Sequence, residues 1–227
     1  MAYDDRYDPD TDFDRWFTVG TGRAISPWIR SGDRVLELGC ATGLMSVSLV
    51  AAGASVTGVD RSDAYLERAR ARGIPGAEFL QGEVTDLALG RQFDHVVATN
   101  LAQEVREPSA LMAVVAAHLR PGGLAHLTVP NPRSLHRLVG VEMGLLEDQR
   151  GLGERSIELE TLRTLDADDL ERMAASVGLR CVHRSGVMVK PLPNALMGTL
   201  PEAVLEGLIG AARHVPELSA MAYIVVR

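Results

Sequence analysis

The sequence lacks the features that mark secreted and membrane proteins. Its 227 residues include only two cysteines, Cys40 and Cys181, and both fall inside apolar runs, where a free thiol packs as a small hydrophobic group. No run of about 18 apolar residues occurs, and the acidic N-terminal stretch MAYDDRYDPDTDFDRWF has no apolar signal core. These absences predict a cytoplasmic protein that has no membrane partner.

Positive charge is also scarce. The formal net charge is -7 and the pI is about 5.4, so the averaged electrostatic field repels phosphate backbones. The densest basic stretch, residues 61–72, also contains Asp63 and Glu67 and is typical of a solvated helix face. No group of histidines, cysteines and carboxylates has metal-ligand spacing. The sequence therefore predicts neither a nucleic-acid partner nor a metal site.

The rest of the composition is that of a globular protein. Hydrophobic residues make up 46% of the chain and charged residues 23%, and no internal repeat or low-complexity tract interrupts the sequence. A chain of this length buries a continuous hydrophobic core without disulfides. We therefore predict a single domain spanning residues 1–227.

Short β-branched runs alternate with helical patterns, which is typical of a doubly wound α/β fold built on a parallel sheet. The predicted strands are Asp33–Gly39, Ala54–Asp60, Ala77–Gln81, Phe93–Thr99, Gly123–Val129, Cys181–Lys190 and Ala220–Val226. The predicted helices include one that Ser62 caps, Pro108–Leu119 followed by the turn RPGG, Asp166–Gly178 capped by Asp166, and Glu202–Ala212.

Three segments depart from this alternation and are predicted to cover a site. Residues 1–30 carry Tyr7, Phe13 and Trp16 and are interpreted as a helical lid, with simple packing as the alternative. Residues 131–165 contain HRLVGVEMGLLED, which is predicted as one short amphipathic helix. Residues 191–216 hold four prolines, and long connections of this kind commonly cover a binding site.

The most informative segment is VLELGCATGLMSVSLVAAGASVTGVDRS, which runs through a strand, a glycine turn, a helix and a second strand that ends in an acid. Gly39 and Gly43 bracket a tight turn where the backbone approaches a ligand, and the helix that follows points its N-terminal amides at that ligand. Asp60 ends the second strand, 17 residues after Gly43. A carboxylate there accepts hydrogen bonds from the hydroxyls of a ribose. Its alternative role is to cap a helix.

Glycine spacing separates the two cofactor classes that use this geometry. Dinucleotide sites follow G-x-G-x-x-G, whereas this chain reads E-x-G-x-x-x-G through Glu37, Gly39 and Gly43. Ala41 replaces the middle glycine, and its Cβ would crowd a pyrophosphate. Glu37 favours a cationic ligand, and S-adenosylmethionine carries both a sulfonium and an ammonium group. The spacing therefore disfavours a nicotinamide oxidoreductase.

At these residues the sequence resembles the class I S-adenosylmethionine-dependent methyltransferases, and the resemblance extends over nearly the whole chain. VLELGCATG resembles the family's first motif, which places Glu37, Gly39, Cys40 and Gly43 around the methionine part of the cofactor. VTGVD resembles the second motif and implies that Asp60 binds the ribose. The family fold is a Rossmann-like sheet of seven strands, mostly parallel with an antiparallel last strand, covered by helices on both faces.

Later segments extend the resemblance. LQGEVTDL is similar to the segment that flanks adenine, with Glu83 where the family usually has aspartate; a plain surface carboxylate is the alternative. FDHVVATNLAQEVREPSALM resembles the fourth strand and the next helix, which implies that Asn100 and Leu101 pass beside the cofactor. The family often reads L-E-H-V where this chain reads LAQEV, so its usual histidine is missing.

Three residues are candidates for the acceptor side. His136 follows the fifth strand at its carboxyl end and is the candidate general base, with packing as the alternative. Arg137 is a candidate for binding an acidic acceptor, or else pairs with Glu142 or Asp148. Glu104 is a candidate for binding an amine acceptor; the alternative is a solvent-exposed carboxylate at the start of a helix.

The sequence thus predicts methyl transfer from S-adenosylmethionine to an oxygen or nitrogen of a small-molecule acceptor, with S-adenosylhomocysteine as product. The segments VPNPRSLHRLVGVEMGLL and VKPLPN resemble bacterial members from sugar and secondary-metabolite pathways, including antibiotic biosynthesis. A protein or nucleic-acid methyltransferase and a non-catalytic S-adenosylmethionine-binding scaffold remain as alternatives. The sequence does not fix the oligomeric state.

Overall fold

The computed structural model describes residues 6–159 and 161–227, which form a seven-stranded sheet of order β3-β2-β1-β4-β5-β7-β6. The strands are β1 (Arg34–Leu38), β2 (Ser55–Asp60), β3 (Ala77–Gln81), β4 (Phe93–Thr99), β5 (Leu119–Pro130), β6 (Cys181–Val189) and β7 (Ser219–Val226). The pairs β3-β2, β2-β1, β1-β4 and β4-β5 are parallel, whereas β7 is antiparallel to both β5 and β6. The predicted doubly wound α/β sheet with an antiparallel last strand is therefore confirmed.

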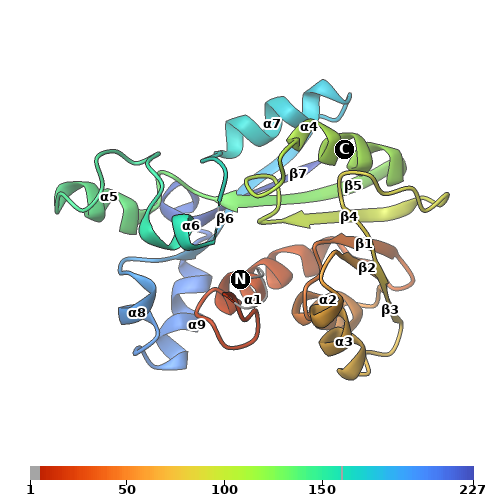
Figure 1. The fold of residues 1–227 in the computed structure, drawn as a ribbon, viewed down its shortest axis with the longest axis horizontal. Helices are drawn as coiled ribbons and strands as arrows, with labels where there is room; N and C mark the ends of the chain where they lie inside the picture. Colours follow the sequence, from red (N-terminus) through yellow and green to blue (C-terminus); the bar gives the residue numbers. More distant parts are fainter. Residues whose placement is uncertain (1–5, 160) are drawn as a thin grey trace.

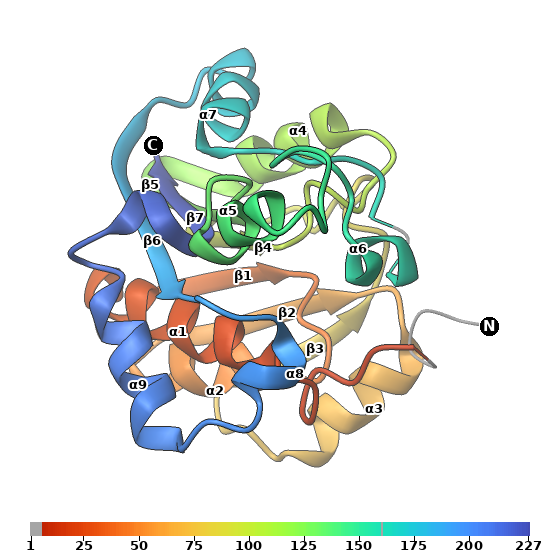
Figure 2. The same ribbon diagram turned by 90° about the vertical axis from the view of Figure 1, so that its left-hand side faces the viewer.

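Helices cover both faces of the sheet (Figure 1). The helices α1 (Arg15–Ile25), α2 (Leu44–Ala51), α3 (Asp63–Ala71) and α9 (Glu202–Ala211) lie on one face, and α4 (Pro108–His118) and α7 (Ala167–Ser176) lie on the other. The short helices α5 (Leu135–Glu142), α6 (Glu154–Glu158) and α8 (Asn194–Met197) gather at one end of the sheet, beside the N-terminal segment (Figure 2). No helix in the described ranges is long and apolar enough to cross a membrane.

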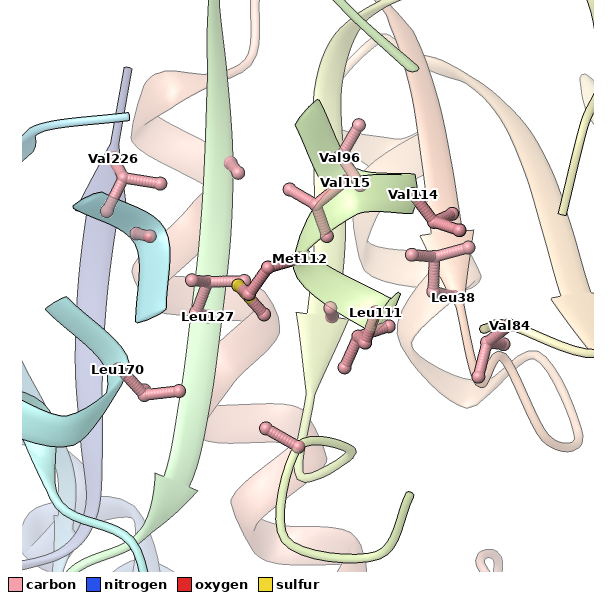
Figure 3. Close-up of a cluster of buried hydrophobic side chains, with 14 of the residues drawn as sticks. Leu38, Val84, Val96, Leu111, Met112, Val114, Val115, Leu127, Leu170 and Val226 are labelled. Carbon is pink, nitrogen blue, oxygen red and sulfur yellow. The ribbon is translucent and has the colours of Figure 1, made fainter. Parts of the chain in front are cut away.

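Burial on both faces explains why the central strands read as continuous apolar runs. In β1 every residue after Arg34 is buried, and all of β7 is buried. On the face under α4 and α7, Met112 and Leu170 pack against Leu127 of β5 (Figure 3). Fully burying each of these side chains contributes about 1.5–3 kcal/mol, so the core holds the strand ends in fixed positions.

Local capping signals are reproduced by the structure. The Ser62 side chain accepts a hydrogen bond from the backbone N–H of Tyr65 at the start of α3. Asp166 and Asp169 form a reciprocal capping box at the start of α7. Each cap satisfies backbone donors that the first helical turn leaves unpaired, which stabilises the helix by about 1 kcal/mol.

Two element boundaries differ from the predictions. The predicted turn RPGG belongs to β5, which starts at Leu119 and takes in residues 120–123 as an irregularity opposite Asp94. The predicted single helix from His136 to Asp148 is shorter, because α5 ends at Glu142 and Gly144 adopts a positive φ of 69°. Strand pairing with β4 therefore extends β5 into the predicted turn, and the left-handed backbone at Gly144 ends the predicted helix early.

Helix α1 forms part of the sheet's covering layer. Its Trp16 and Phe17 are buried in the core with Ile25. At Gly20 an added Cβ would lie 2.6 Å from Val187 Cγ1, so α1 approaches β6 too closely for any side chain there. Trp16 therefore has the packing role that was the alternative for the N-terminal aromatic residues.

Candidate functional site

A cavity of about 1670 Å³ lies at the edge of the sheet where the parallel strands end. Because β6 and β5 are both antiparallel to β7, β6 runs parallel to the other strands and ends at the same edge. Residues that end or follow β1, β2, β3, β4, β5 and β6 all line the cavity. Open α/β sheets bind ligands at this edge, and pockets for one small molecule measure roughly 300–1,000 Å³. The cavity therefore has room for a cofactor together with an acceptor.

The turn between β1 and α2 has the backbone that its glycines permit. Gly39 and Gly43 adopt φ values of 73° and 74°, in the left-handed region. The N–H of Gly39 donates to the carbonyl of Val59 at 2.8 Å, which ties the turn to β2. A Cβ added at Gly39 would lie 3.3 Å from Leu101 Cδ1. A side chain at position 39 would therefore narrow the cavity.

Asp60 is the last residue of β2, and its carboxylate is held by the backbone. Oδ2 accepts from the N–H of Ala41 at 2.9 Å, and Oδ1 accepts from the N–H of Ser62 at 2.9 Å. Ser62, and not Asp60, is the N-cap residue of α3. Each carboxylate oxygen has two acceptor positions, so the fixed group retains capacity for the two hydroxyls of a ribose.

Glu37 is a buried carboxylate on the cavity wall, only 4% exposed. It accepts a hydrogen bond from the Ser46 hydroxyl, and no basic side chain in the described part of the chain pairs with it. Burial and the nearby charge of Asp60 raise the pKa of Glu37 to about 7. A cationic ligand stabilises the ionised form of such a buried, unpaired carboxylate, because the positive charge offsets the cost of desolvation.

Cys40 and Glu83 lie on the cavity wall in different ways. The Cys40 side chain is 3% exposed and packs with Phe79, so burial raises the pKa of its thiol. A Cβ at Gly58 would lie 2.9 Å from Cys40 Sγ, which makes glycine the residue that admits this packing. Cys40 therefore lines the cavity as a buried residue packed on Phe79, whereas Glu83 is exposed in the loop after β3.

Asn100 and Leu101 follow β4 on the opposite side of the glycine turn. Asn100 adopts a positive φ of 52°, and its N–H donates to the carbonyl of Thr128 at 3.0 Å. The Thr128 hydroxyl donates to Asn100 Oδ1 at 3.2 Å. Of the predicted cofactor-binding residues, all except Gly43 line the cavity; Gly43 is the N-cap residue of α2 and packs toward Phe79 and Ala69.

The predicted acceptor residues Glu104, His136 and Arg137 also line the cavity. Burial and the positive charges of Lys190 and Arg137 lower the pKa of His136 to about 3, so its imidazole is neutral, far from the near-neutral pKa of a free histidine. The Arg137 guanidinium donates to the carbonyls of Gln149 and Gly151. It thereby braces the loop after α5 and forms no ion pair with Glu142 or Asp148 among the described residues.

Residues that the sequence did not single out connect the segments around the cavity. Arg155 of α6 pairs with Asp12 at 2.7 Å and with Asp14 at 3.6 Å. Asn194 of α8 donates to Asp14 Oδ1 at 2.8 Å. Of residues 191–216, only 193–195 line the cavity, whereas α9 contacts β6. No short sequence motif marks these contacts, because they join positions up to 180 residues apart.

In the part of the chain that the structure describes, no three histidine, cysteine or acidic side chains are placed to hold a metal ion.

Comparison with known proteins agrees with this geometry. A family model described as a methyltransferase domain matches residues 19–184. The chain is 36% identical over 132 residues to the cypemycin N-terminal methyltransferase of a Streptomyces species, which covers 54% of each chain. It is 31% identical over 174 residues to the ubiquinone biosynthesis O-methyltransferase of Rhizobium etli, which covers 74% of this chain and 68% of that one. The alignments thus span about half to two thirds of the length of these curated relatives.

The fold also matches solved structures. Magnesium protoporphyrin IX methyltransferase from Synechocystis, crystallised with S-adenosylhomocysteine, superimposes with a TM-score of 0.62. The superposition covers 93% of this chain and 85% of that one at 16% sequence identity. The match of the family model over most of the chain shows the family directly. This chain belongs to the class I S-adenosylmethionine-dependent methyltransferases.

Proposed function

We propose that this protein transfers a methyl group from S-adenosylmethionine to an oxygen or nitrogen atom of a small-molecule metabolite, such as a natural product or a sugar. The observation that supports this most strongly is one cavity that is lined both by predicted cofactor-binding residues and by half-buried polar residues. S-adenosylmethionine supplies an electrophilic methyl group on a positively charged sulfur.

The residues of this chain divide the binding work between them. Glu37 stabilises the positive charge at the methionine end of the cofactor, and the glycine turn leaves room for the cofactor to lie against the protein backbone. Asp60 accepts hydrogen bonds from the ribose hydroxyls. Glu83, Asn100 and Leu101 flank the rest of the nucleoside. These groups fix one reactant, and alignment of the two reactants accounts for much of the rate gain in a displacement of this kind.

The acceptor side holds the other reactant between Glu104, His136 and the segments that cover the cavity. His136 stays neutral, so it acts as a hydrogen-bond acceptor toward the acceptor's O–H or N–H group. Two curated relatives are named for a peptide N-terminus and for ubiquinone biosynthesis, which supports nitrogen and oxygen as acceptor atoms. Residues 7–14, 131–159 and 161–165 act as the cover over this chamber.

Calorimetric titration with S-adenosylmethionine, S-adenosylhomocysteine and NAD, followed by assays with labelled cofactor, tests the proposal. We expect both S-adenosyl ligands to bind and NAD not to bind. Asp60→Ala should weaken both by about tenfold or more, because two hydrogen bonds to a charged group are lost. Unchanged affinities in Asp60→Ala would refute the ribose assignment. Binding without transfer to any acceptor in bacterial metabolite extracts would favour a non-catalytic protein.

His136→Ala should lower turnover and leave the affinity for S-adenosylhomocysteine nearly unchanged, because His136 lies on the acceptor side. The measurement is the rate of methyl transfer under saturating cofactor, with calorimetry as the control for cofactor binding. Full activity of this variant would reduce His136 to a packing residue.

A further inference from the structure

Lys190 is the only lysine in the sequence; the other 22 of the 23 basic residues are arginines. It directly follows β6, lines the cavity and is only 7% exposed. Lysine differs from arginine in being a compact cation on a flexible stem that fits where a planar guanidinium does not. The chain therefore places its one compact cation inside the cavity.

The charge of Lys190 has no counter-ion in the described part of the chain. Its ammonium lies over the ring of Phe17, 6.0 Å from the centroid, and no carboxylate comes within ion-pair distance. Asp14 stabilises the charge from farther away, and Arg137 opposes it. Burial is the main cause that lowers the pKa of Lys190 to about 8. A buried cation in this state gains strongly from a ligand that supplies negative charge.

Other polar atoms on the cavity wall are also unsatisfied. His136 Nδ1 and Asn194 Oδ1 are buried and have no hydrogen-bond partner within the described ranges. Gln103 Oε1 is likewise buried without a hydrogen-bond partner in the described part of the chain, and Gln103 also lines the cavity. Each such group costs about 1–3 kcal/mol while unpaired, so polar ligand atoms that satisfy them bind favourably. The chamber therefore fits a polar ligand better than a purely apolar one.

The strand order separates Lys190 from the cofactor residues. β6 is four strands away from β1, which corresponds to about 19 Å at the usual spacing between strands. Glu37 and Gly39 end β1, and Asp60 ends β2, which lies farther still. Lys190 thus faces the part of the cavity that the cofactor residues leave for the acceptor.

Resting on the proposed function, we propose that Lys190 binds an anionic oxygen of the acceptor, so that the acceptor is an acidic molecule bearing a carboxylate or an ionised phenol. A phenol held there needs no separate base, because the cation stabilises the phenolate and the proton passes to water. The phenolate oxygen would then bond to the methyl carbon as the sulfur–methyl bond breaks and sulfur keeps the electron pair, which gives a methyl ether and S-adenosylhomocysteine. A carboxylate held there orients an acceptor whose methylated atom lies elsewhere in the molecule.

Binding of matched probes to the full chain saturated with S-adenosylhomocysteine tests this inference. The carboxylate pair is 4-hydroxybenzoate and its neutral amide, and the phenolate pair is 4-nitrophenol and nitrobenzene. Calorimetry should give about tenfold or tighter binding of at least one anion over its neutral partner. Preference within the first pair identifies a carboxylate site, and preference within the second pair identifies a phenolate site.

The matched variants are Lys190→Met, which keeps an unbranched side chain one heavy atom shorter, and Arg133→Met, which removes an exposed cation outside the cavity. We expect Lys190→Met to lose the preference for the anion and to bind S-adenosylhomocysteine as the wild type does, whereas Arg133→Met should keep both properties. In wild-type protein labelled with [15N]lysine, the single side-chain signal should shift with the anion and not with its neutral partner.

Several results would overturn the inference. Equal binding of anion and neutral partner, absence of anion binding at millimolar concentration, or an unchanged preference in Lys190→Met would each exclude an anion site at Lys190. If Lys190→Met weakens S-adenosylhomocysteine but not 5′-methylthioadenosine, which lacks the carboxylate, Lys190 serves the cofactor instead. Failure of the wild type to bind S-adenosylhomocysteine would instead contradict the proposed function itself.

Discussion

Glu37 is a residue where stability and binding oppose each other. Its carboxylate is buried next to Asp60 and has only the Ser46 hydroxyl as a hydrogen-bond partner among the described residues. The pKa of Glu37 is about 7 in the folded protein, well above the ordinary value near 4.3. The ligand-free protein therefore loses stability from this group as the pH rises from about 4.3 to 7, because the unfolded chain gives up this proton readily while the buried carboxyl resists ionisation.

The first prediction concerns the pH dependence of cofactor affinity. Below pH 7 Glu37 is largely protonated, and a neutral carboxyl group stabilises a cationic ligand only weakly. Affinity for S-adenosylmethionine should therefore rise between about pH 6 and pH 7.5. Binding near pH 6.5 should release a proton, which calorimetry in buffers of different ionisation enthalpy measures. Glu37→Gln should remove this release; an identical release in the variant would show that another group titrates.

The second prediction is that Glu37→Gln stabilises the ligand-free protein at pH 8, because it removes the buried negative charge. Thermal unfolding without ligand should show a higher Tm for the variant than for the wild type, while affinity for S-adenosylmethionine falls. A lower Tm at pH 8 would mean that the Glu37 carboxylate is stabilising in the folded state.

The roles of individual residues were predictable only where a local pattern carries them. Gly39 and Asp60 lie within one strand-turn-helix-strand segment, so their spacing alone predicted a shared site. Lys190 was predicted only as the end of a strand, because its position in the cavity depends on β6 pairing with β7 at the far edge of the sheet. A count of lysines would have drawn attention to it.

At the level of elements, exposed ion pairs hold the cover over the cavity. Asp8 and Asp10 pair with Arg68 of α3, and Asp10 also accepts from the Thr42 hydroxyl in the glycine turn. Arg155 joins Asp12 from the opposite side. Exposed and partly exposed pairs contribute only about 0–1 kcal/mol each, so no single pair holds the cover firmly.

The third prediction follows from those pairs. Arg155→Ala should speed dissociation of S-adenosylhomocysteine several-fold and change unfolding free energy by less than about 1 kcal/mol, because the lost pairs are partly exposed. Stopped-flow displacement gives the rate, and raised salt should reproduce the effect in the wild type. Arg172→Ala is the control, since it removes an exposed pair with Asp169 in α7. An unchanged dissociation rate would show that α6 does not retain the ligand.

Elements with a long periodic pattern or a capping signal were predicted well, and short elements were not. α7 was predicted with Asp166 as its N-cap residue, and the structure has that cap. α6 and α8 span five and four residues, too few for a helical period to emerge from the sequence. The start of β5 was missed because Leu119 pairs with Phe93, a contact that no local pattern encodes.

At the scale of the whole molecule, a buried polar chain crosses the sheet. His95 lies 3.1 Å from Asp33 and 3.0 Å from His126, and His126 lies 2.7 Å from the Tyr223 hydroxyl. All of these contacts are satisfied when both histidines are neutral, with the tyrosine O–H donating to His126, His126 donating to His95, and His95 donating to Asp33. Burial lowers the pKa of both histidines and so favours this neutral arrangement.

The fourth prediction is a loss of stability in acid. Because both histidines bind protons more readily in the unfolded chain, stability is complete above about pH 6.5 and falls below it. Tyr223→Phe leaves His126 without its donor and should cost about 1–3 kcal/mol at pH 7.5. Urea denaturation measures both effects, with the exposed His214→Gln as control. In the Glu37→Gln background, which removes the opposite pH dependence of Glu37, stability that does not change between pH 7.5 and pH 5.5 would contradict this assignment.

The fold as a whole was predictable from the sequence because apolar strands alternate with capped helices over most of the chain. The cross-sheet polar chain was not, since β4, β5 and β7 become neighbours only in the folded sheet. The cavity likewise depends on segments from both ends of the chain meeting at one edge.

A crystal structure of the protein with S-adenosylmethionine or S-adenosylhomocysteine tests the cofactor site most directly. We predict that the nucleoside occupies the cavity with its ribose hydroxyls on Asp60 and its methionine end at the turn formed by residues 39–43. An empty turn in such crystals, or a turn occupied by the pyrophosphate of a dinucleotide, would contradict the cofactor assignment.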